Sequence, residues 1–388
     1  MKKRSISVKY DYTNMESLII EIEWRCVKIK IACIGSYYDQ GFSHGRAAKK
    51  LIGENLALIH QILSEKKSDL ELYTSFVNKH FKNVFNLEPY LEEELRGIAD
   101  GSGYSFWDVI MLNANFYFFA DKIVAAPEEC SVIIAGPQAT LDRKTYFIKN
   151  RDMHYPFQTV ILERRFEDGV RISEVDLAGI VTFPGSAFNH YGLGVSTTGV
   201  WSPNIPLDFG LIGNLPYSFS PHTFVRNFKT VDEVLAFLEG KYPYKISRSN
   251  LFLIDPTKAV RVETTDKGFR VCEWNNDLLV GTNHFHHPDF LPYNPDRAHY
   301  QSTYQRYDRA MEMLEENYGR LRFQDMLEIA SDHMHGENCL CRHGENGGGI
   351  TICSTITCLE DQKSWTAVRN PCEALIPSHI DCLKKESQ

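Results

Sequence analysis

The sequence predicts a layered α+β domain, because helical and strand patterns occupy separate stretches of the chain. Apolar residues recur at helical spacing from residue 36 to residue 120, and short β-branched or aromatic runs follow from Cys130 onward. Two helices and two further strands close the chain. This segregation fits helices packed on antiparallel sheets better than alternating βαβ units. We find no internal repeat or low-complexity linker, so one compact domain is expected.

The helical stretch is expected to contain at least three helices. Gly101 and Gly103 predict the end of one of them. Ser105 has the residue type of an N-cap and starts the next helix, which is expected to extend to Phe119. The apolar positions that share one helical face are Leu51, Leu56, Ile59 and Leu63 in the first helix, and Leu91, Leu95 and Ile98 in the second.

The predicted strands are short runs separated by Gly, Pro, Asp and Asn. Two helices are expected late in the chain, at 303–318 and 323–332, the first with Ser302 as its N-cap. Strands are predicted at 6–10, 18–22, 27–32, 131–135, 145–149, 159–163, 170–175, 179–183, 191–198, 250–254, 259–264, 269–273, 278–281, 349–357 and 364–368.

Composition limits the classes of function. Hydrophobic residues make up 43% and charged residues 24%, as in a globular protein. The net charge of −8 argues against nucleic-acid binding, and no apolar run approaches the roughly 20 residues of a membrane helix. Residues 1–12 are basic but lack the apolar stretch of a signal peptide, so a cytoplasmic protein is expected. Ten cysteines are too few for a disulfide scaffold.

Cys130 is the first candidate for chemistry. It stands where helices give way to strands, and the polar run 149–155 ends the strand that is predicted to pair with its own. A hairpin returns the chain beside its start, so Asp152 is expected within reach of the Cys130 backbone nitrogen. A cysteine at a strand start is most often a buried apolar thiol, and spacing alone leaves that alternative open.

The pattern Cys130-Ser131-Val132, a hairpin, and then Asn150-x-Asp152 resembles the isopenicillin N (acyl-CoA:6-aminopenicillanate) acyltransferase family. That family belongs with choloylglycine hydrolases and acid ceramidases among the N-terminal-nucleophile hydrolases. The resemblance implies a four-layer αββα sandwich, in which two mainly antiparallel sheets face each other under helices. Further stretches with this likeness are 35–45, 249–255, 281–284, 331–333, 341–343 and 370–373.

The resemblance also implies a precursor that cuts itself before the nucleophile. The scissile bond is then Glu129–Cys130, which leaves an α chain of residues 1–129 and a β chain of residues 130–388 that stay associated. In the precursor, the thiol attacks the Glu129 carbonyl in an N→S acyl shift, and water hydrolyses the thioester. The new α-amino group, with an intrinsic pKa of about 7.7–8.0, can take the thiol proton without a histidine.

Roles follow residue by residue from the same resemblance. Asp152 matches the aspartate that holds the cysteine amine and thiol, and Asn150 matches the asparagine two residues before it. Asn250 is a candidate oxyanion or amine ligand, with a strand cap as the alternative. Arg342 lies where an arginine contributes to the site of the acyltransferase. Lys149 has either a cationic role or the exposure that is usual for lysine.

Two positions depart from the family pattern. Glu129 stands where a glycine usually precedes the nucleophile, so a carboxylate beside the scissile bond is a candidate for slowing or redirecting self-cleavage. Thr198 stands where relatives often carry an asparagine as an oxyanion-hole donor. Loss of one such donor costs about 3–4 kcal/mol of transition-state stabilisation. Either Thr198 substitutes, a backbone N–H fills the role, or the chemistry differs.

The predicted function is therefore chemistry on a linear amide through a thioester on Cys130, with an acyl amide or acyl-CoA as substrate and no cofactor. Water as acceptor makes the enzyme an amidohydrolase, whereas an amine or CoA thiol makes it an acyltransferase. Two alternatives remain: an inactive relative that acts as a binding module, and a structural zinc site. The zinc candidates match the usual ligand spacing poorly, and they are Cys339, Cys341, His343, Cys353 and Cys358.

Overall fold

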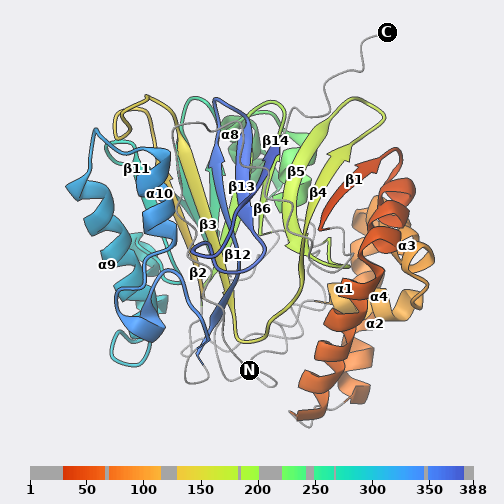
Figure 1. Ribbon diagram of the computed structural model, residues 1–388. Coiled ribbons are helices and arrows are strands. Elements are labelled where there is room, and N and C mark those ends of the chain that lie inside the picture. Colours follow the sequence, from red (N-terminus) through yellow and green to blue (C-terminus); the bar gives the residue numbers. More distant parts are fainter. Residues whose placement is uncertain are drawn as a thin grey trace, which may run out of the picture.

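Two β-sheets lie face to face, and helices cover their outer surfaces (Figure 1). This computed structural model describes residues 29–65, 70–114, 129–181, 185–200, 221–241, 249–265, 268–344 and 348–379. The layers are those of the αββα sandwich expected from the sequence, so the predicted fold class is confirmed.

The first sheet has eight strands. Its neighbouring strands pair antiparallel, except β1 and β4, which run parallel. Their order is β1 (Lys30–Ile34), β4 (Thr159–Arg165), β5 (Arg171–Leu177), β6 (Ser186–Asn189), β7 (Gly194–Gly199), β8 (Ser249–Ile254), β9 (Ala259–Thr265) and β10 (Gly268–Glu273).

The second sheet has six strands, all antiparallel to their neighbours. The β2–β3 hairpin lies inside this sheet, so the strand that carries Cys130 is paired on both sides. The order is β11 (Leu278–Gly281), β2 (Glu129–Ala135), β3 (Tyr146–Met153), β12 (Ile350–Cys358), β13 (Lys363–Ala367) and β14 (Ile376–His379).

Separate groups of helices pack on the two sheets (Figure 1). The first four helices pack at the β1–β4 edge of the eight-stranded sheet, the next two cover its remaining outer face, and the last two cover the six-stranded sheet. The helices are α1 (Tyr37–Glu65), α2 (Leu70–Leu87), α3 (Pro89–Ser102), α4 (Phe106–Asn113), α7 (Pro221–Asn227), α8 (Val231–Lys241), α9 (Gln301–Glu316) and α10 (Phe323–Ala330), with 3₁₀ turns at Pro288–Tyr293 and Gly336–Asn338.

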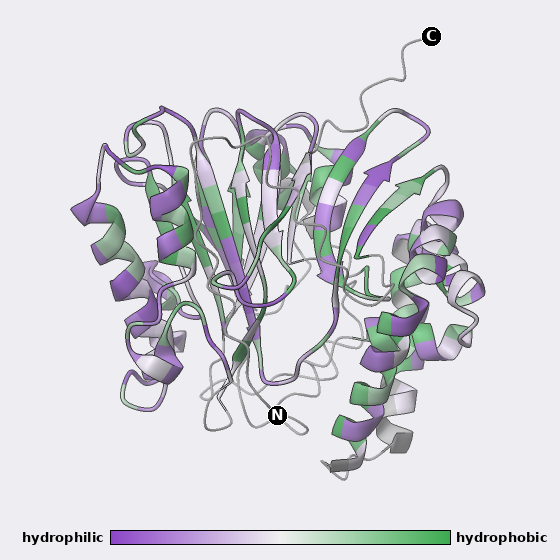
Figure 2. Cartoon of the chain, viewed as in Figure 1, coloured by the Kyte–Doolittle hydropathy of each residue, from purple (hydrophilic) through white to green (hydrophobic). Residues whose placement is uncertain are grey.

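Strand alternation in β2 explains why the two sheets stack. Val132 and Ile134 point into the core between the sheets, where Phe252 of the other sheet also lies. Ile133 and Ala135 point the other way and pack under α9 and α10. Figure 2 shows hydrophobic and hydrophilic residues side by side on the outer helices, as expected for helices that bury one face only.

One predicted strand, 179–183, is wrong where the structure describes it. Gly179 lies in a turn, and Ile180 and Val181 have no regular structure, because side chains of α1 and α4 bind the backbone there. Asn113 accepts from Val181 N (2.9 Å) and donates to Gly179 O (2.7 Å), and His44 Nε2 accepts from Gly179 N (3.0 Å). The backbone groups that a strand would pair are thus used by side chains.

Two predicted helix ends also differ from the structure. Ser302 is not the N-cap of α9, which is Tyr300; its hydroxyl binds Glu129 instead. Gly101 lies inside α3, and only Gly103 ends that helix, in a left-handed conformation. Ser105 is confirmed as the N-cap of α4, in a capping box with Asp108.

Sequence patterns did not predict several other elements. The helices α7 and α8 and the short strands β6 and β14 were not predicted, whereas β1 matches part of the strand expected at 27–32. The strands predicted at 6–10 and 18–22 lie outside the described residues. The helix predicted to extend from Ser105 to Phe119 is shorter, because α4 ends at Asn113 and its C-cap Ala114 is extended. Residues 115–119 lie outside the described part of the chain. Among the described helices, none combines the length and hydropathy that a membrane crossing requires.

Close packing of α1 on α3 generates the first prediction. A Cβ added at Gly45 would lie 2.3 Å from Ile98 O, so Gly45→Ala is expected to push the helices apart and to lower the free energy of unfolding by about 1–3 kcal/mol. Gly240→Ala in α8 is the matched control, because no atom lies within 4 Å of its added Cβ. Helix propensity should make that control neutral or more stable. Urea denaturation measures both, and equal midpoints would contradict the predicted close contact.

Candidate active site

Cys130 is the second residue of β2 and is 4% exposed. The run of β-branched residues after it forms a strand that pairs antiparallel with β3. This pairing sets Glu129 opposite Asp152 and Cys130 opposite Arg151, as the expected hairpin requires. The Cys130 backbone N–H donates to Asn283 Oδ1 (2.9 Å).

Arg306 of α9 binds the backbone next to the predicted scissile bond. Its side chain is 0% exposed, and Nη1 donates to Cys130 O (2.6 Å) and Ser131 Oγ (2.8 Å). Nη2 donates to Asn283 Oδ1 (2.8 Å), and Nε donates to Ser302 Oγ (3.1 Å). Burial lowers the pKa of Arg306, and the neighbouring carboxylates oppose this effect.

Glu129 is held by two cations and a hydroxyl. Its carboxylate accepts from Arg342 Nη1 and from Ser302 Oγ, and it lies 3.6 Å from Arg306 Nη2. The negative charge of the Glu129 side chain is therefore balanced by ion pairs. Arg342 thus contacts the residue before the predicted cleavage position.

Asp152 is fully buried next to these cations. Its Oδ1 accepts from Thr351 Oγ1 (2.7 Å), while Oδ2 has no hydrogen-bond partner among the described residues. Burial raises the pKa of Asp152 to about 6, and the charges of Arg306 and Arg342 oppose the rise. One oxygen of the Asp152 carboxylate thus remains free to accept a hydrogen bond.

Asn150 points away from Cys130. Its Nδ2 donates to Ala330 O (2.9 Å) and Leu340 O (2.8 Å), and its Oδ1 accepts from Ser354 Oγ (2.6 Å). These contacts tie β3 to the end of α10, to the following loop and to β12. The structure therefore places Asn150 as a support of the sheet, two residues before Asp152, the carboxylate opposite Glu129.

Lys149 is buried, so the expectation of an exposed lysine is wrong. Its side chain lies on the inner face of β3, and Nζ donates to Thr197 O (2.6 Å) of the eight-stranded sheet. Arg151 on the same face lies 3.9 Å from Asp176 of β5. Both cations connect the two sheets near Cys130.

Thr198 and Asn250 face each other in register on β7 and β8. Asn250 Nδ2 donates to Thr198 Oγ1 (3.0 Å), Thr282 O (3.1 Å) and His284 O (3.2 Å), and the Thr198 hydroxyl donates to Thr282 O. Their donors are directed at the segment that carries Asn283 rather than at a vacant oxyanion position. In this uncut chain, the pair positions Asn283.

The sequence reasoning missed three residues of this site: Ser302, Arg306 and Asn283. Asn283 lies in the stretch 281–284 that carried the family resemblance, and its Nδ2 donates to Gly199 O (2.8 Å). Arg306 had one sequence signal. It occupies the helical face of α9 that also buries Ala310 and Leu314, where an apolar residue is expected.

One cluster of described residues could hold a metal ion. Ligand atoms of His333, Cys341, His343 and Cys372 all lie within 4.8 Å of one another. The zinc set considered from the sequence shares only Cys341 and His343 with it. Cys339 donates its thiol hydrogen to Cys341 O (2.9 Å), and the two buried cysteines of β12 lie outside the cluster.

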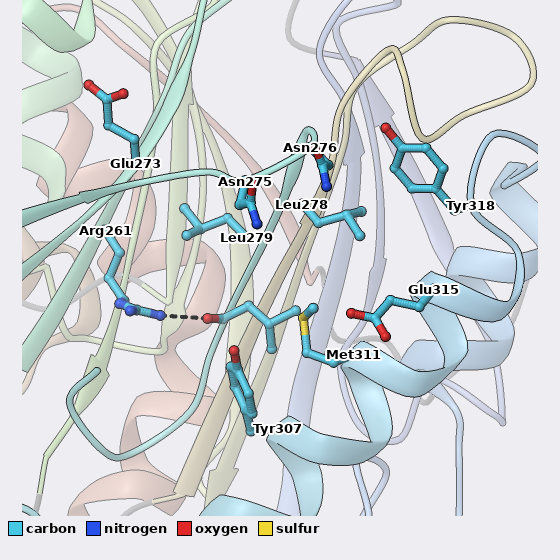
Figure 3. Close-up of a pocket in the computed structure, with 11 residues that line it drawn as sticks. Arg261, Glu273, Asn275, Asn276, Leu278, Leu279, Tyr307, Met311, Glu315 and Tyr318 are labelled. Carbon is cyan, nitrogen blue, oxygen red and sulfur yellow. Dashed lines mark hydrogen bonds between the residues drawn. The ribbon is translucent and has the colours of Figure 1, made fainter. Parts of the chain in front are cut away.

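A cavity of about 420 Å³ opens between α9 and the strands β9 and β11 (Figure 3). Tyr307 and Met311 of α9 face Leu279 across it, and Arg261 donates to Val280 O (2.7 Å) at its wall. The described residues that line it include none of the predicted catalytic side chains. This cavity is therefore separate from the Cys130 site.

Two sheets face each other under outer helices, and Cys130 stands near the start of a strand inside the second sheet, which is the arrangement that the sequence resemblance implied. The family model of the acyl-coenzyme A:6-aminopenicillanic acid acyl-transferases matches residues 140–373, which is more than half of the chain. The chain belongs to this acyltransferase family, so the resemblance found in the sequence is confirmed.

Solved structures of similar proteins share little sequence with this chain. A mutant of the conjugated bile acid hydrolase from Clostridium perfringens is 14% identical, with 65% of this chain and 92% of that chain covered and a TM-score of 0.42. The N-acylethanolamine-hydrolyzing acid amidase ortholog of Caenorhabditis elegans is 17% identical, with 59% of this chain and 93% of that chain covered and a TM-score of 0.44. Penicillin V acylase from Agrobacterium tumefaciens is 14% identical, with 61% of this chain and 82% of that chain covered and a TM-score of 0.41.

The burial of Arg306 generates a prediction for stability. Arg306→Met leaves Glu129 with one cation fewer and removes the hydrogen bonds to Cys130 and Ser131, so the free energy of unfolding should fall by about 3 kcal/mol. Arg297→Met is the control, because its ion pair with Asp308 is exposed and is worth at most about 1 kcal/mol. Urea denaturation in an uncut Cys130→Ala background compares the two. An equal loss of unfolding free energy in the two variants would contradict the stabilising role of the buried Arg306 contacts.

The raised pKa of Asp152 generates a pH prediction. The folded chain binds the Asp152 proton more tightly than the unfolded chain does, so this group stabilises the fold below pH 3.8 and the stabilisation is lost as the pH rises to about 6. Asp152→Asn should remove that part of the pH dependence. The measurement is the urea midpoint against pH in the Cys130→Ala background. Identical profiles with and without Asp152 would refute the assigned shift.

Proposed function

We propose that the chain is a precursor that cuts its own Glu129–Cys130 bond and then transfers or hydrolyses an acyl group through a thioester on Cys130. The observation that carries the proposal is the pair of contacts at Cys130: Arg306 binds its carbonyl oxygen and Asn283 binds its N–H. Membership of the acyltransferase family supports the same reaction class.

The processing step is an acyl shift followed by hydrolysis. The Cys130 sulfur attacks the Glu129 carbonyl carbon, the C–N bond breaks, and the thiol proton passes to the departing nitrogen. Water then hydrolyses the thioester, which frees the thiol and gives Glu129 a terminal carboxylate. The ion pairs of Glu129 support this step, because they hold the acyl side of the bond in place and neutralise the side-chain carboxylate.

After the cut, the Cys130 N–H becomes an α-amino group. Asn283 Oδ1, which already accepts from that nitrogen, and the unoccupied Oδ2 of Asp152 are the proposed partners of the amine. The amine then acts as the base for the thiol.

We also propose that the two chains stay together after cleavage, as one domain. Residues before the cut supply β1, which pairs with β4, and helices that bury apolar side chains against the same sheet. An acyl amide or an acyl-CoA remains the proposed substrate class, with no cofactor. Transfer between acyl-CoA and an amine is the reaction for which the family is named. The cytoplasmic location expected from the sequence stays a prediction.

The mass of the purified protein tests the proposal. Wild type should give fragments of about 15 and 30 kDa, from a 44.6 kDa chain of 388 residues cut after residue 129, and the large fragment should begin with Cys130. Cys130→Ala should stay whole and form no thioester with acyl amides. Cys33→Ala, which changes another buried strand cysteine, should still be cut.

Two results would contradict the proposal in different ways. A whole wild-type chain whose amidase activity survives Cys130→Ala would exclude Cys130 as nucleophile. A whole chain with no activity on any acyl amide or acyl-CoA would instead favour the binding-module alternative.

A further inference from the structure

The His333, Cys341, His343 and Cys372 cluster, here called the His2Cys2 cluster, has the dimensions of a tetrahedral metal site. The sulfur atoms of Cys341 and Cys372 are 3.7 Å apart, and the Nε2 atoms of His333 and His343 are 3.1 Å apart. His343 Nε2 lies 3.8 Å from the Cys341 sulfur and 3.4 Å from the Cys372 sulfur. Ideal zinc bond lengths in a tetrahedron separate the ligands by about 3.8 Å (S–S), 3.3 Å (N–N) and 3.6 Å (N–S).

Three separate segments supply the cluster. His333 follows α10, Cys341 and His343 lie in the loop before β12, and Cys372 lies in the turn after β13. Two imidazoles and two thiols without a carboxylate are the ligands of a borderline-soft ion such as Zn²⁺, and they suit Ca²⁺ and Mg²⁺ poorly. Three of the four residues are exposed, so an ion can enter from solvent.

Hydrogen bonds outside the cluster orient its ligands. The buried Asn370 donates from Nδ2 to the Cys341 sulfur (3.5 Å) and to Arg342 O (2.6 Å). Cys341 N donates to Asp332 O (3.0 Å), next to His333. N–H bonds to a ligand sulfur are the usual outer support of a thiolate–metal site.

Two ligands of the cluster flank Arg342, a residue of the candidate active site. Arg342 stands between the ligands Cys341 and His343, and its guanidinium binds Glu129. Arg342 N also donates to Thr351 Oγ1 (2.8 Å), whose hydroxyl binds Asp152. An ion bound by Cys341 and His343 would fix the backbone on both sides of Arg342.

We propose that the His2Cys2 cluster binds one Zn²⁺ ion, and that this ion holds the loop that positions Arg342. The binding of zinc is independent of the proposed function. An effect of zinc on self-cleavage would rest on the proposed function, because it would act through the contact between Arg342 and Glu129.

Metal binding is tested on the full chain with zinc and cobalt. Wild type should bind one Zn²⁺ per chain in competition with a chromogenic chelator, and Co²⁺ should give the visible spectrum of a tetrahedral thiolate site. Cys372→Ser and His333→Gln should each weaken zinc binding by about 100-fold or more, and Asn370→Ala by about 10-fold or more. Cys272→Ser, which changes a cysteine outside the cluster, should bind zinc as wild type does.

The positioning of Arg342 is tested by trypsin. Arg342 is buried, so the zinc-loaded chain should resist cutting after it, whereas the chelator-treated chain should be cut there. Exposed sites such as Arg297 serve as internal controls, because their cutting should not depend on zinc. Equal cutting after Arg342 with and without zinc would refute its positioning by the ion.

Other outcomes separate the hypotheses. Wild type without stoichiometric zinc binding or a tetrahedral cobalt spectrum would overturn the metal site, whether or not the variants fold. A Cys341–Cys372 disulfide, seen as a mass lower by two hydrogens and blocked thiols, would also overturn it. Stoichiometric zinc in a chain that never cuts itself would leave the site standing and refute the proposed function.

Discussion

The buried guanidinium of Arg306 is the interaction on which the geometry around Cys130 depends. A charge removed from water destabilises the fold by several kcal/mol unless partners surround it. Here the partners come from β2, from the segment after β11 and from α9 itself. The start of β2, the start of α9 and the segment after β11 are therefore fixed relative to one another, because all three supply hydrogen-bond partners to one buried cation.

The sandwich explains why this polar site is stable inside the protein. Inner-face residues of both sheets form an apolar core around Phe147, Phe188 and Phe252, and the buried cations lie toward one end of it. Lys149 and Arg151 cross from one sheet to the other there. The apolar core aligns the strands, and the charged contacts select the arrangement at their ends.

Local patterns predicted the hairpin from Cys130 to Asp152, because alternation and turn residues within one segment determine it. They failed for 179–181, where Asn113 and His44 of distant helices bind the backbone. The roles of Asn283 and Arg306 could not be predicted for a similar reason, since both arise from how a helix and a loop dock on β2.

The same limit applies to the cysteines and histidines. Spacing along the chain grouped Cys341 and His343 with near neighbours, whereas the fold brings in His333 and Cys372 from separate turns. Burial of Lys149 also escaped prediction, because its partner is a carbonyl group of the opposite sheet. Chemistry that depends on one segment is readable from sequence, and chemistry assembled across layers requires the structure.

The position of β1 has a consequence for the cut protein that we propose. This strand comes from before Cys130, yet it completes the eight-stranded sheet beside β4. Once the peptide link is broken, global unfolding also separates two molecules, so the melting temperature rises with protein concentration. Refolding of the proposed cut form would then require a bimolecular encounter, so its lifetime would depend on the rate of unfolding.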